Sequence, residues 1–262
     1  MSTEFQEDLE RAATILESAN YTIALTGAGM SVESGIPPLR GPGGLWTKLG
    51  EPPMTGYQTF LKDPRAWWEN SLANEQPSEM TDFQVALANA TPNDGHYALV
   101  ALEKIGLLQY LITQNVDGLH VDAGTQNIAE IHGNTRKVRC IGCGFRIDRD
   151  DFSFFEIPPK CPECGDIIKS DGVMFGEPIP TATLAICQQE TLKADCILIL
   201  GTSATVHPAA SLPETVYRNG GNLIEVNPER TPLSTFCSVT LCGTTGVVLP
   251  ELLSLLKNKR NP

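Results

Sequence analysis

The sequence predicts an α/β fold in which a parallel sheet carries helices on both faces and a smaller domain is inserted into it. Five short apolar runs without polar alternation are typical of parallel strands covered on both sides. They span residues 22–27, 107–113, 196–201, 222–227 and 239–243. Helical patterns separate several of these runs, as in a sheet wound on both faces.

The expected helices have recognisable ends and faces. Residues 1–20 place Phe5, Leu9, Ala12 and Leu16 on one face, and their acidic start favours an amphipathic helix over a signal peptide. Residues 92–106 have Asp94 as the expected N-cap and a glycine as the stop. Residues 181–194 and 209–220 are the helices expected before the last two longer strands.

Two segments interrupt the alternation of strand and helix. Residues 41–90 are rich in proline and glycine and then become aromatic and helical, and residues 134–178 hold two cysteine pairs. We expect these insertions to pack together as the smaller domain. Residues 1–40, 91–133 and 179–262 then form the larger one.

Composition limits the possible partners. The 262 residues carry a net charge of −12, which argues against nucleic-acid binding because phosphate backbones require clustered Lys and Arg. A basic peptide suits this charge better. No apolar run approaches the roughly 20 residues of a membrane span. We therefore expect a cytoplasmic protein that binds neither nucleic acid nor membrane.

Four of the eight cysteines form two C-x-x-C pairs, Cys140 with Cys143 and Cys161 with Cys164. A glycine follows each pair and permits a sharp turn. This spacing is typical of a zinc ribbon, with disulfides or a redox pair as the alternatives. Because four thiolates close the shell of a tetrahedral ion, the predicted zinc is structural rather than catalytic.

Polar residues follow three of the apolar runs. Gly27, Ala28 and Gly29 follow the first, Gln114 and Asn115 with Asp117 the second, and Gly201, Thr202 and Ser203 the third. Ligands of such folds bind at the carboxyl ends of the strands. The loop "GAGMSVESGIPPLR" begins like a dinucleotide-binding turn, but Val32 stands where a third glycine is expected.

Seven strings in register resemble the sirtuins, the NAD-dependent protein deacylases. They are "GAGMSVESGIPPLR", "TQNVDGLH", "IHGN", the paired cysteines, "VMFGE", "GTSATVHPAA" and "EVNPERTP", and the resemblance covers roughly residues 10–255. It implies a Rossmann-like parallel sheet with a smaller zinc-ribbon plus helical insertion domain. It also implies that NAD is consumed as a co-substrate in a cleft that receives an acyl-lysine protein or peptide.

The resemblance implies a role for each matching residue. His132 would be the general base, for which an imidazole suits because its pKa lies near neutral pH. Asn115 and Asp117 would serve the nicotinamide end, with an Asx turn as the alternative. The implied NAD contacts are Gly27, Ala28, Gly29, Ser31, Ile36, Arg40, Gln114, Asn115, Asp117, Gly201, Thr202, Ser203, Asn227, Glu229 and Thr245. The implied substrate contacts are Val173, Phe175, Gly176, Glu177 and Val206.

Several of these assignments carry a physical expectation. Gly27 and Gly29 would let backbone N–H groups approach phosphate, and Arg40 would add a charged donor. For the hydroxyls of Thr202 and Ser203 the alternative is a helix N-cap.

The chain differs from its relatives in two informative places. Leu39 stands where they usually have Phe. The Tyr and Arg pair that recognises acidic acyl groups is missing from "AWWENSLANEQ", so we expect neutral acyl groups to be removed. Two rival functions stay open at this point, a protein ADP-ribosyltransferase on the same fold and an inactive module that binds ADP-ribose.

Overall fold

The computed structural model describes residues 3–73 and 77–260, and its larger part is a six-stranded parallel sheet. The strand order is β3-β2-β1-β7-β8-β9, from Ile128–Glu130, Tyr110–Thr113, Thr22–Thr26, Cys196–Leu200, Asn222–Asn227 and Val239–Cys242. Because β1 has β2 on one side and β7 on the other, the chain reverses its winding direction between β1 and β7. Parallel sheets form their ligand crevice at this place.

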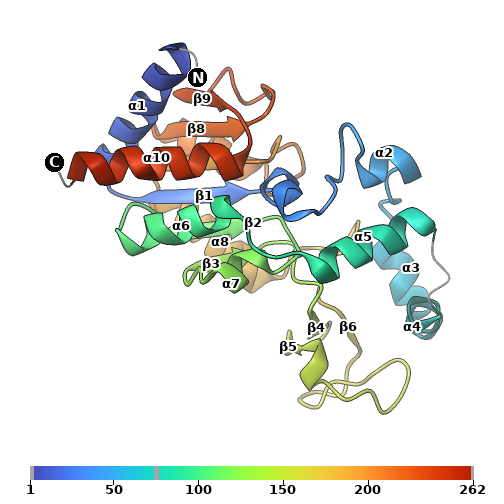
Figure 1. Cartoon of the computed structure of the whole chain (residues 1–262). Helices are drawn as coiled ribbons and strands as arrows, with labels where there is room; N and C mark the ends of the chain where they lie inside the picture. The colour runs from blue at the N-terminus through green and yellow to red at the C-terminus, as the bar shows by residue number, and fades with distance from the viewer. Residues whose placement is uncertain (1–2, 74–76, 261–262) are drawn as a thin grey trace.

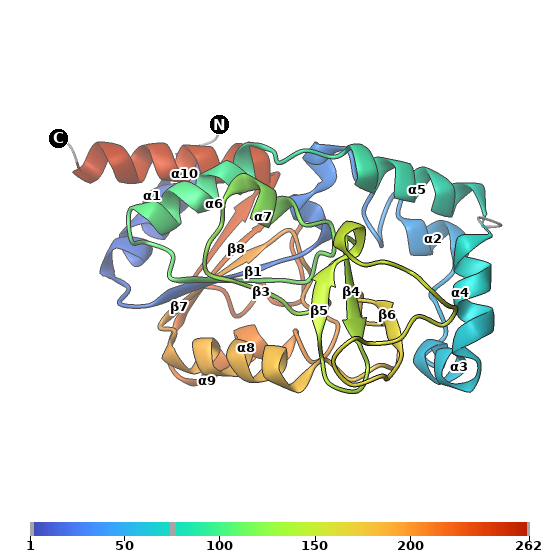
Figure 2. The ribbon, with the colours of Figure 1, turned by 90° about the horizontal axis from the view of Figure 1, so that it is seen from below.

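Helices cover both faces of this sheet (Figures 1 and 2). One face carries α1, α6, α7 and α10, which span Thr3–Ser18, Asp94–Lys104, Leu119–Ala123 and Thr245–Arg260. The other carries α8 (Thr181–Lys193) and α9 (Ser211–Arg218). The predicted fold class is therefore confirmed.

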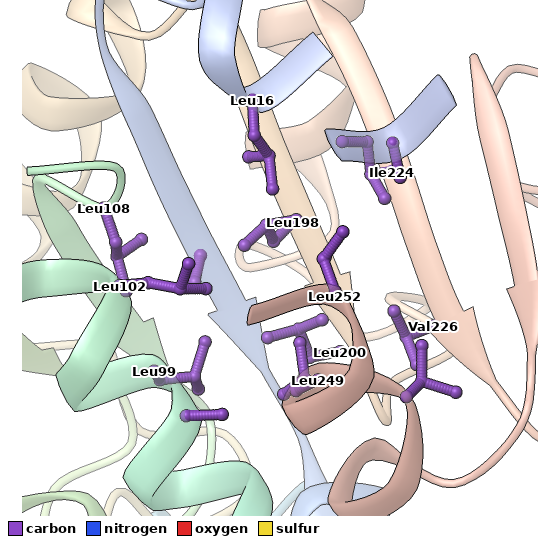
Figure 3. Close-up of a cluster of buried hydrophobic side chains, with 14 of the residues drawn as sticks. Leu16, Leu99, Leu102, Leu108, Leu198, Leu200, Ile224, Val226, Leu249 and Leu252 are labelled. Atoms are coloured by element: carbon purple, nitrogen blue, oxygen red, sulfur yellow. The ribbon is translucent and has the colours of Figure 1, made fainter. Parts of the chain in front are cut away.

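Side chains of the central strands alternate between two apolar cores. Leu198 and Leu200 of β7 pack with Leu99, Leu249 and others on the α1, α6 and α10 side (Figure 3). The residues between them, Ile197 and Ile199, pack on the α8 and α9 side. Consecutive side chains of β7 are thus buried on opposite faces of the sheet, which explains why the sequence shows a continuous apolar run there.

The two insertions lie together beyond the carboxyl ends of the strands (Figure 2). The first holds α2 (Leu45–Leu49), α3 (Gly56–Lys62), α4 (Pro64–Leu72) and α5 (Ser78–Asn89). The second holds an antiparallel sheet in the order β5-β4-β6, from Arg146–Asp148, Lys137–Cys140 and Ile168–Ser170. Trp68 of α4 is fully buried and donates to the carbonyl of Ile168 at 2.9 Å, which ties the insertions together. The exact domain boundaries stay a prediction.

Some predicted ends differ in the structure. Asn93, not Asp94, caps α6: its side chain accepts from the backbone N–H groups of Gly95 and His96, and the backbone N–H of Asn93 donates to Nδ1 of His96. The strand predicted from residue 107 begins at Tyr110. Helix α10 was not predicted, since Pro250 lies inside it and proline usually interrupts a helix. Within the described residues, no helix has both the length and the apolar character needed to cross a membrane.

Candidate active site

A cavity of about 1340 Å³ lies at the carboxyl ends of the strands and extends between the sheet and the insertions. It exceeds the roughly 300–1000 Å³ of a pocket for one drug-sized ligand. Of the residues predicted from the sequence, the following line it: Gly27, Ala28, Gly29, Ser31, Ile36, Arg40, Gln114, Asn115, Asp117, His132, Val173, Phe175, Gly176, Glu177, Gly201, Thr202, Ser203, Val206, Asn227 and Glu229. Thr245 is instead buried at the start of α10 and is not among the lining residues.

The loop after β1 crosses the loop after β7 at very short range. A Cβ atom on Gly29 would lie 2.7 Å from the Cα of Gly201, and one on Gly27 would lie 2.6 Å from the Cβ of Thr202. The N–H of Gly27 donates to the carbonyl of Leu200 at 3.0 Å and that of Gly29 to Gly201 at 2.8 Å. The N–H groups of both glycines are therefore already bonded within the protein, and contact of this loop with phosphate stays a prediction. The two glycines are needed because the loops touch.

Three polar side chains form a buried chain beside this crossing. Asn115 donates from Nδ2 to the carbonyl of Gly27 at 2.9 Å and to Ser31 Oγ at 3.1 Å. Ser31 donates in turn to Asp117 Oδ2 at 2.7 Å, and Asp117 Oδ1 accepts from the N–H of Leu119. Asp117 therefore makes the Asx turn and also holds Ser31. These bonds fix the orientation of the Asn115 amide toward the cavity.

His132 follows strand β3 and is held in one tautomer. Its Nδ1 lies 3.1 Å from the carbonyl oxygen of Gln114, which can only accept, so Nδ1 carries the proton. The Nε2 atom then has a free lone pair in the neutral ring. Burial lowers the pKa of His132, and the bond to Gln114 opposes this effect. The imidazole is consequently neutral at pH 7 and able to accept a proton.

Gln114, Thr202 and Asn227 connect the ends of three strands. Gln114 Nε2 donates to Thr202 Oγ1 at 2.9 Å, and Asn227 Nδ2 donates to the carbonyl of Thr202 at 3.0 Å. The hydroxyl of Thr202 also accepts from the N–H of Ala204, a local turn and not a helix N-cap. Ser203 is exposed and free to meet a ligand, apart from a bond to Thr205.

Arg40 lines the cavity but already has a partner. Its Nε atom lies 2.6 Å from the Oε1 of Glu51, and this bond raises the pKa of Arg40. Both side chains are well exposed. An anionic ligand would therefore compete with Glu51 for Arg40.

The first insertion contributes to the cavity an apolar wall that was not predicted from the sequence. Met80, Phe83 and Leu87 face the cavity from α5, together with Trp46 and Met54. The α5 residues recur at i, i+3 and i+7, the spacing of one helical face, which is the signal that could have identified them. Trp46 also packs edge-on against Phe175 with ring centroids 6.3 Å apart.

The segment from Val173 to Glu177 forms a second wall, which adjoins the first at Trp46 and Met54. The N–H of Val173 donates to the carbonyl of His132 at 2.9 Å, so this segment is joined to the histidine loop. The Phe175 carbonyl accepts from Tyr57 N–H at 3.1 Å, which joins this segment to α3 as well.

The Glu177 side chain is buried and bonded within the protein. It contacts Lys169 at 3.0 Å and Arg139 at 2.8 Å in an ionic cluster, and it accepts from the N–H of Met174. The cluster pairs three cations with three anions, namely Lys169, Arg139, Arg146, Asp171, Glu130 and Glu177. Glu177 thus stabilises the wall, and its contact with substrate stays a prediction.

The four paired cysteines meet at one point of the second insertion. Their Sγ atoms all lie within 4.8 Å of one another, with Cys140 and Cys164 3.5 Å apart and Cys143 and Cys161 3.6 Å apart. A zinc–sulfur distance of about 2.3 Å places the corners of a tetrahedron about 3.8 Å apart, whereas a disulfide needs about 2.05 Å. The cluster therefore fits one structural zinc ion.

Known proteins share this arrangement. The model of the Sir2 family matches residues 27–208. The NAD-dependent protein deacylase of Thermococcus kodakarensis is 40% identical over 256 residues, covering 95% of this chain and 96% of the relative. NAD-dependent protein deacylase 1 of Archaeoglobus fulgidus is 41% identical over 240 residues, covering 92% and 94%.

Solved structures agree with these relatives. A Sir2 homologue variant in complex with ADP-ribose has a TM-score of 0.80 at 38% identity, covering 96% of this chain and 98% of that one. A Sir2 variant with a deacetylated p53 peptide and 3′-O-acetyl-ADP-ribose has a TM-score of 0.76 at 29% identity, covering 94% and 98%. Sir2Af2 bound to a myristoylated histone peptide has a TM-score of 0.70 at 30% identity, covering 98% and 99%.

Fold, cavity and relatives together define an NAD-dependent protein deacylase with a four-cysteine zinc cluster. The chain belongs to the Sir2 family, the sirtuins.

Proposed function

We propose that the protein removes neutral acyl groups from lysine side chains in this cavity and transfers them to the ADP-ribose part of NAD. The products are nicotinamide, free lysine and O-acyl-ADP-ribose. The observation that carries this proposal is the single tautomer of His132. Its Nδ1 proton is held by Gln114, and the ring lines the same cavity as the crossing of the β1 and β7 loops. One base beside a dinucleotide crevice is what this reaction needs from the protein.

His132 acts as the general base. Its Nε2 accepts the proton of a ribose hydroxyl, and the Gln114 carbonyl stabilises the resulting imidazolium because the Nδ1–H bond persists. A positioned base of this kind contributes about 10²- to 10⁴-fold to the rate.

The remaining polar residues bind and orient NAD. Asn115, oriented by Ser31, meets the nicotinamide end, while Thr202 and Ser203 meet the phosphates and the inner ribose. Asn227 and Glu229, which follow β8, meet the adenosine end. This order follows the crevice from the β2 side to the β8 side of the sheet.

The acyl-lysine enters between the two walls of the cavity. Val173, Phe175 and Val206 contact the lysine stem, and the apolar wall of Met80, Phe83 and Leu87 receives the acyl chain. The cationic lining residues among those described, Arg40 and Arg230, belong to the cofactor loop and to the loop after β8. An acidic acyl group would consequently be buried without a cation, which is costly.

Zinc, when bound, supplies a rigid cross-link for the second insertion, and the cysteines hold it away from the reacting atoms. Binding of basic peptide segments, no binding of nucleic acid and a cytoplasmic location stay predictions from the net charge and the sequence.

The test compares peptides that differ only in the acyl group on one lysine. Acetyl-lysine and longer apolar acyl-lysines should be turned over with a kcat/KM at least about tenfold above succinyl-lysine, because one unpaired buried carboxylate costs more than one hydrogen bond. Equal values for acetyl and succinyl peptides would refute the neutral preference.

The base is tested with a matched pair of histidine variants. His132→Ala should bind NAD but lose deacylation by about 10²-fold or more. His207→Ala removes an exposed imidazole from the same cavity and should keep most of the rate. A similar loss in both variants would show that neither imidazole acts as the positioned base.

A further inference from the structure

Glu225 is a carboxylate inside an otherwise apolar strand. It lies in the middle of β8, is fully buried, and has Ile224 and Val226 as neighbours. Those neighbours belong to the core on the α1 and α10 side, as Figure 3 shows. Glu225 therefore points to the other face, where residues 231–237 cover the end of the sheet. Nothing in the reaction described above uses this group.

The carboxylate is satisfied by neutral donors alone. Its Oε1 accepts from the hydroxyl of Thr231 and, at 3.4 Å, from Nδ2 of Asn227. Its Oε2 accepts from the hydroxyl of Ser234 and, at 3.4 Å, from Thr240. In the part of the chain that the structure describes, no cation forms an ion pair with it. A buried charge of this kind requires all of its donors to be held in place.

Thr240 is a neighbour on β9, and the other three donors come from the two ends of one loop. Asn227 is at the end of β8, and Thr231 and Ser234 form the turn at the far end, where Ser234 Oγ also accepts from the N–H of Thr231 at 2.8 Å. Between these two anchors, Pro228, Glu229 and Arg230 line the cavity. Asn227 continues the connection to the carbonyl of Thr202. Glu225 thus fixes this loop although its own side chain is buried from solvent and does not line the cavity.

We propose that Glu225 is a positioning residue for NAD: it clamps the loop of residues 227–232 in the shape that receives the adenosine end. The inference rests on the proposed assignment of this loop to adenosine. Glu225 touches no substrate and acts through Asn227, Thr231 and Ser234.

Glu225→Gln keeps the volume of the side chain but replaces one acceptor oxygen with a donor that faces a hydroxyl. Hydrogen bonds to charged groups have free energies that correspond to about tenfold or more in an equilibrium constant. We expect the KM for NAD and the Kd for ADP-ribose to rise about tenfold. The kcat at saturating NAD and the KM for an acetyl-lysine peptide should stay within about twofold of wild type.

Two further variants make the test decisive. Ser234→Ala removes one hydroxyl from a residue outside the cavity lining, and it should raise the Kd for ADP-ribose about threefold, the lower part of the range for a single hydrogen bond. It also covers the case in which Glu225→Gln fails to fold.

Glu190→Gln is the matched control. Glu190 is a largely buried carboxylate on α8 that is bonded to Tyr21 and Lys193 and does not line the cavity. Its Kd for ADP-ribose should equal that of wild type.

Calorimetric binding of ADP-ribose separates the possible results. Weaker binding in Glu225→Gln or Ser234→Ala with an unchanged kcat supports the clamp. If Glu225→Gln folds and binds ADP-ribose with wild-type affinity, the clamp is overturned. If only Ser234→Ala folds, wild-type affinity in that variant overturns it. A parallel fall of kcat and peptide affinity also overturns it. Failure of the wild type to bind ADP-ribose would instead overturn the assignment of the loop to adenosine.

Discussion

Replacing Gly29 with alanine tests the crossing of the two cofactor loops most sharply. The new Cβ would lie 2.7 Å from the Cα and 2.9 Å from the carbonyl oxygen of Gly201, whereas ordinary contacts begin at 3.4 Å. The loops would have to separate by about 0.7 Å, and the bond from the Gly29 N–H, now 2.8 Å long, would stretch beyond hydrogen-bonding range. Neither side can rotate away because both contact atoms belong to the backbone.

The expected cost follows from these two effects. Overpacking of this size costs about 1–3 kcal/mol, and the lost hydrogen bond adds about 0.5–1.5 kcal/mol. For a chain of this size, each kcal/mol lowers Tm by about 2–4 °C, so a fall of about 5–10 °C is expected. Because misplacing binding groups by about 1 Å can cost up to 10²-fold, the KM for NAD should rise at least about tenfold.

Gly172→Ala is the matched control, since no atom lies within 4 Å of the added Cβ and the backbone is not left-handed. Thermal denaturation and steady-state kinetics with varied NAD should separate the two variants. If Gly29→Ala matches Gly172→Ala in both Tm and KM, the loops do not need their close approach and the reasoning is refuted.

Four further results are expected. The acid limb of the pH profile of kcat/KM should have its midpoint below pH 6.5, because burial lowers the pKa of His132 and the neutral base is lost only near and below that pKa. A midpoint above pH 6.5 would contradict this. One zinc per chain should be found by elemental analysis, and Cys164→Ala should lose the metal together with the folded second insertion, whereas an active, metal-free protein would exclude the structural role. Leu39 covers less area than an aromatic ring, so it should screen the reactive ribose from water less completely. The ratio of nicotinamide released to lysine freed should therefore exceed one in wild type, rise in Leu39→Ala and fall in Leu39→Phe. A ratio of one in all three proteins would show that Leu39 is a packing residue. Glu51→Gln should lower the KM for NAD by about two- to fivefold, because it releases Arg40 from an exposed ion pair of small strength, and an unchanged KM would show that Arg40 does not contact NAD.

Features with a local signal could be predicted from the sequence. Five of the six strands of the large sheet are short apolar runs, whereas the three residues of β3 were too short to be recognised as a strand. Both cysteine pairs have the spacing of a metal knuckle. The polar residues after β1, β2 and β7 converge because parallel strands bring their carboxyl ends to one edge. His132 could be found only through the resemblance, since a single loop histidine has no pattern of its own.

Features that depend on contacts between distant segments could not be predicted. Gly29 meets Gly201, which is far along the chain, so the sequence alone suggested a free N–H where the structure has a bonded one. Helix α10 contains Pro250, and its packing against α6 outweighs the local preference. The contacts of Glu225 could not be predicted either, because its partners Thr231 and Ser234 follow later in the sequence.

The central claim is that this cavity transfers an acyl group from lysine to the ribose of consumed NAD. Mass spectrometry of one reaction with NAD and an acetyl-lysine peptide measures all three products directly. We expect free lysine and O-acetyl-ADP-ribose in equal amounts, exceeded slightly by nicotinamide, and deacylation slowed by about 10²-fold or more in His132→Ala. Transfer of ADP-ribose to the protein or peptide without free lysine, or no turnover at all, would contradict it.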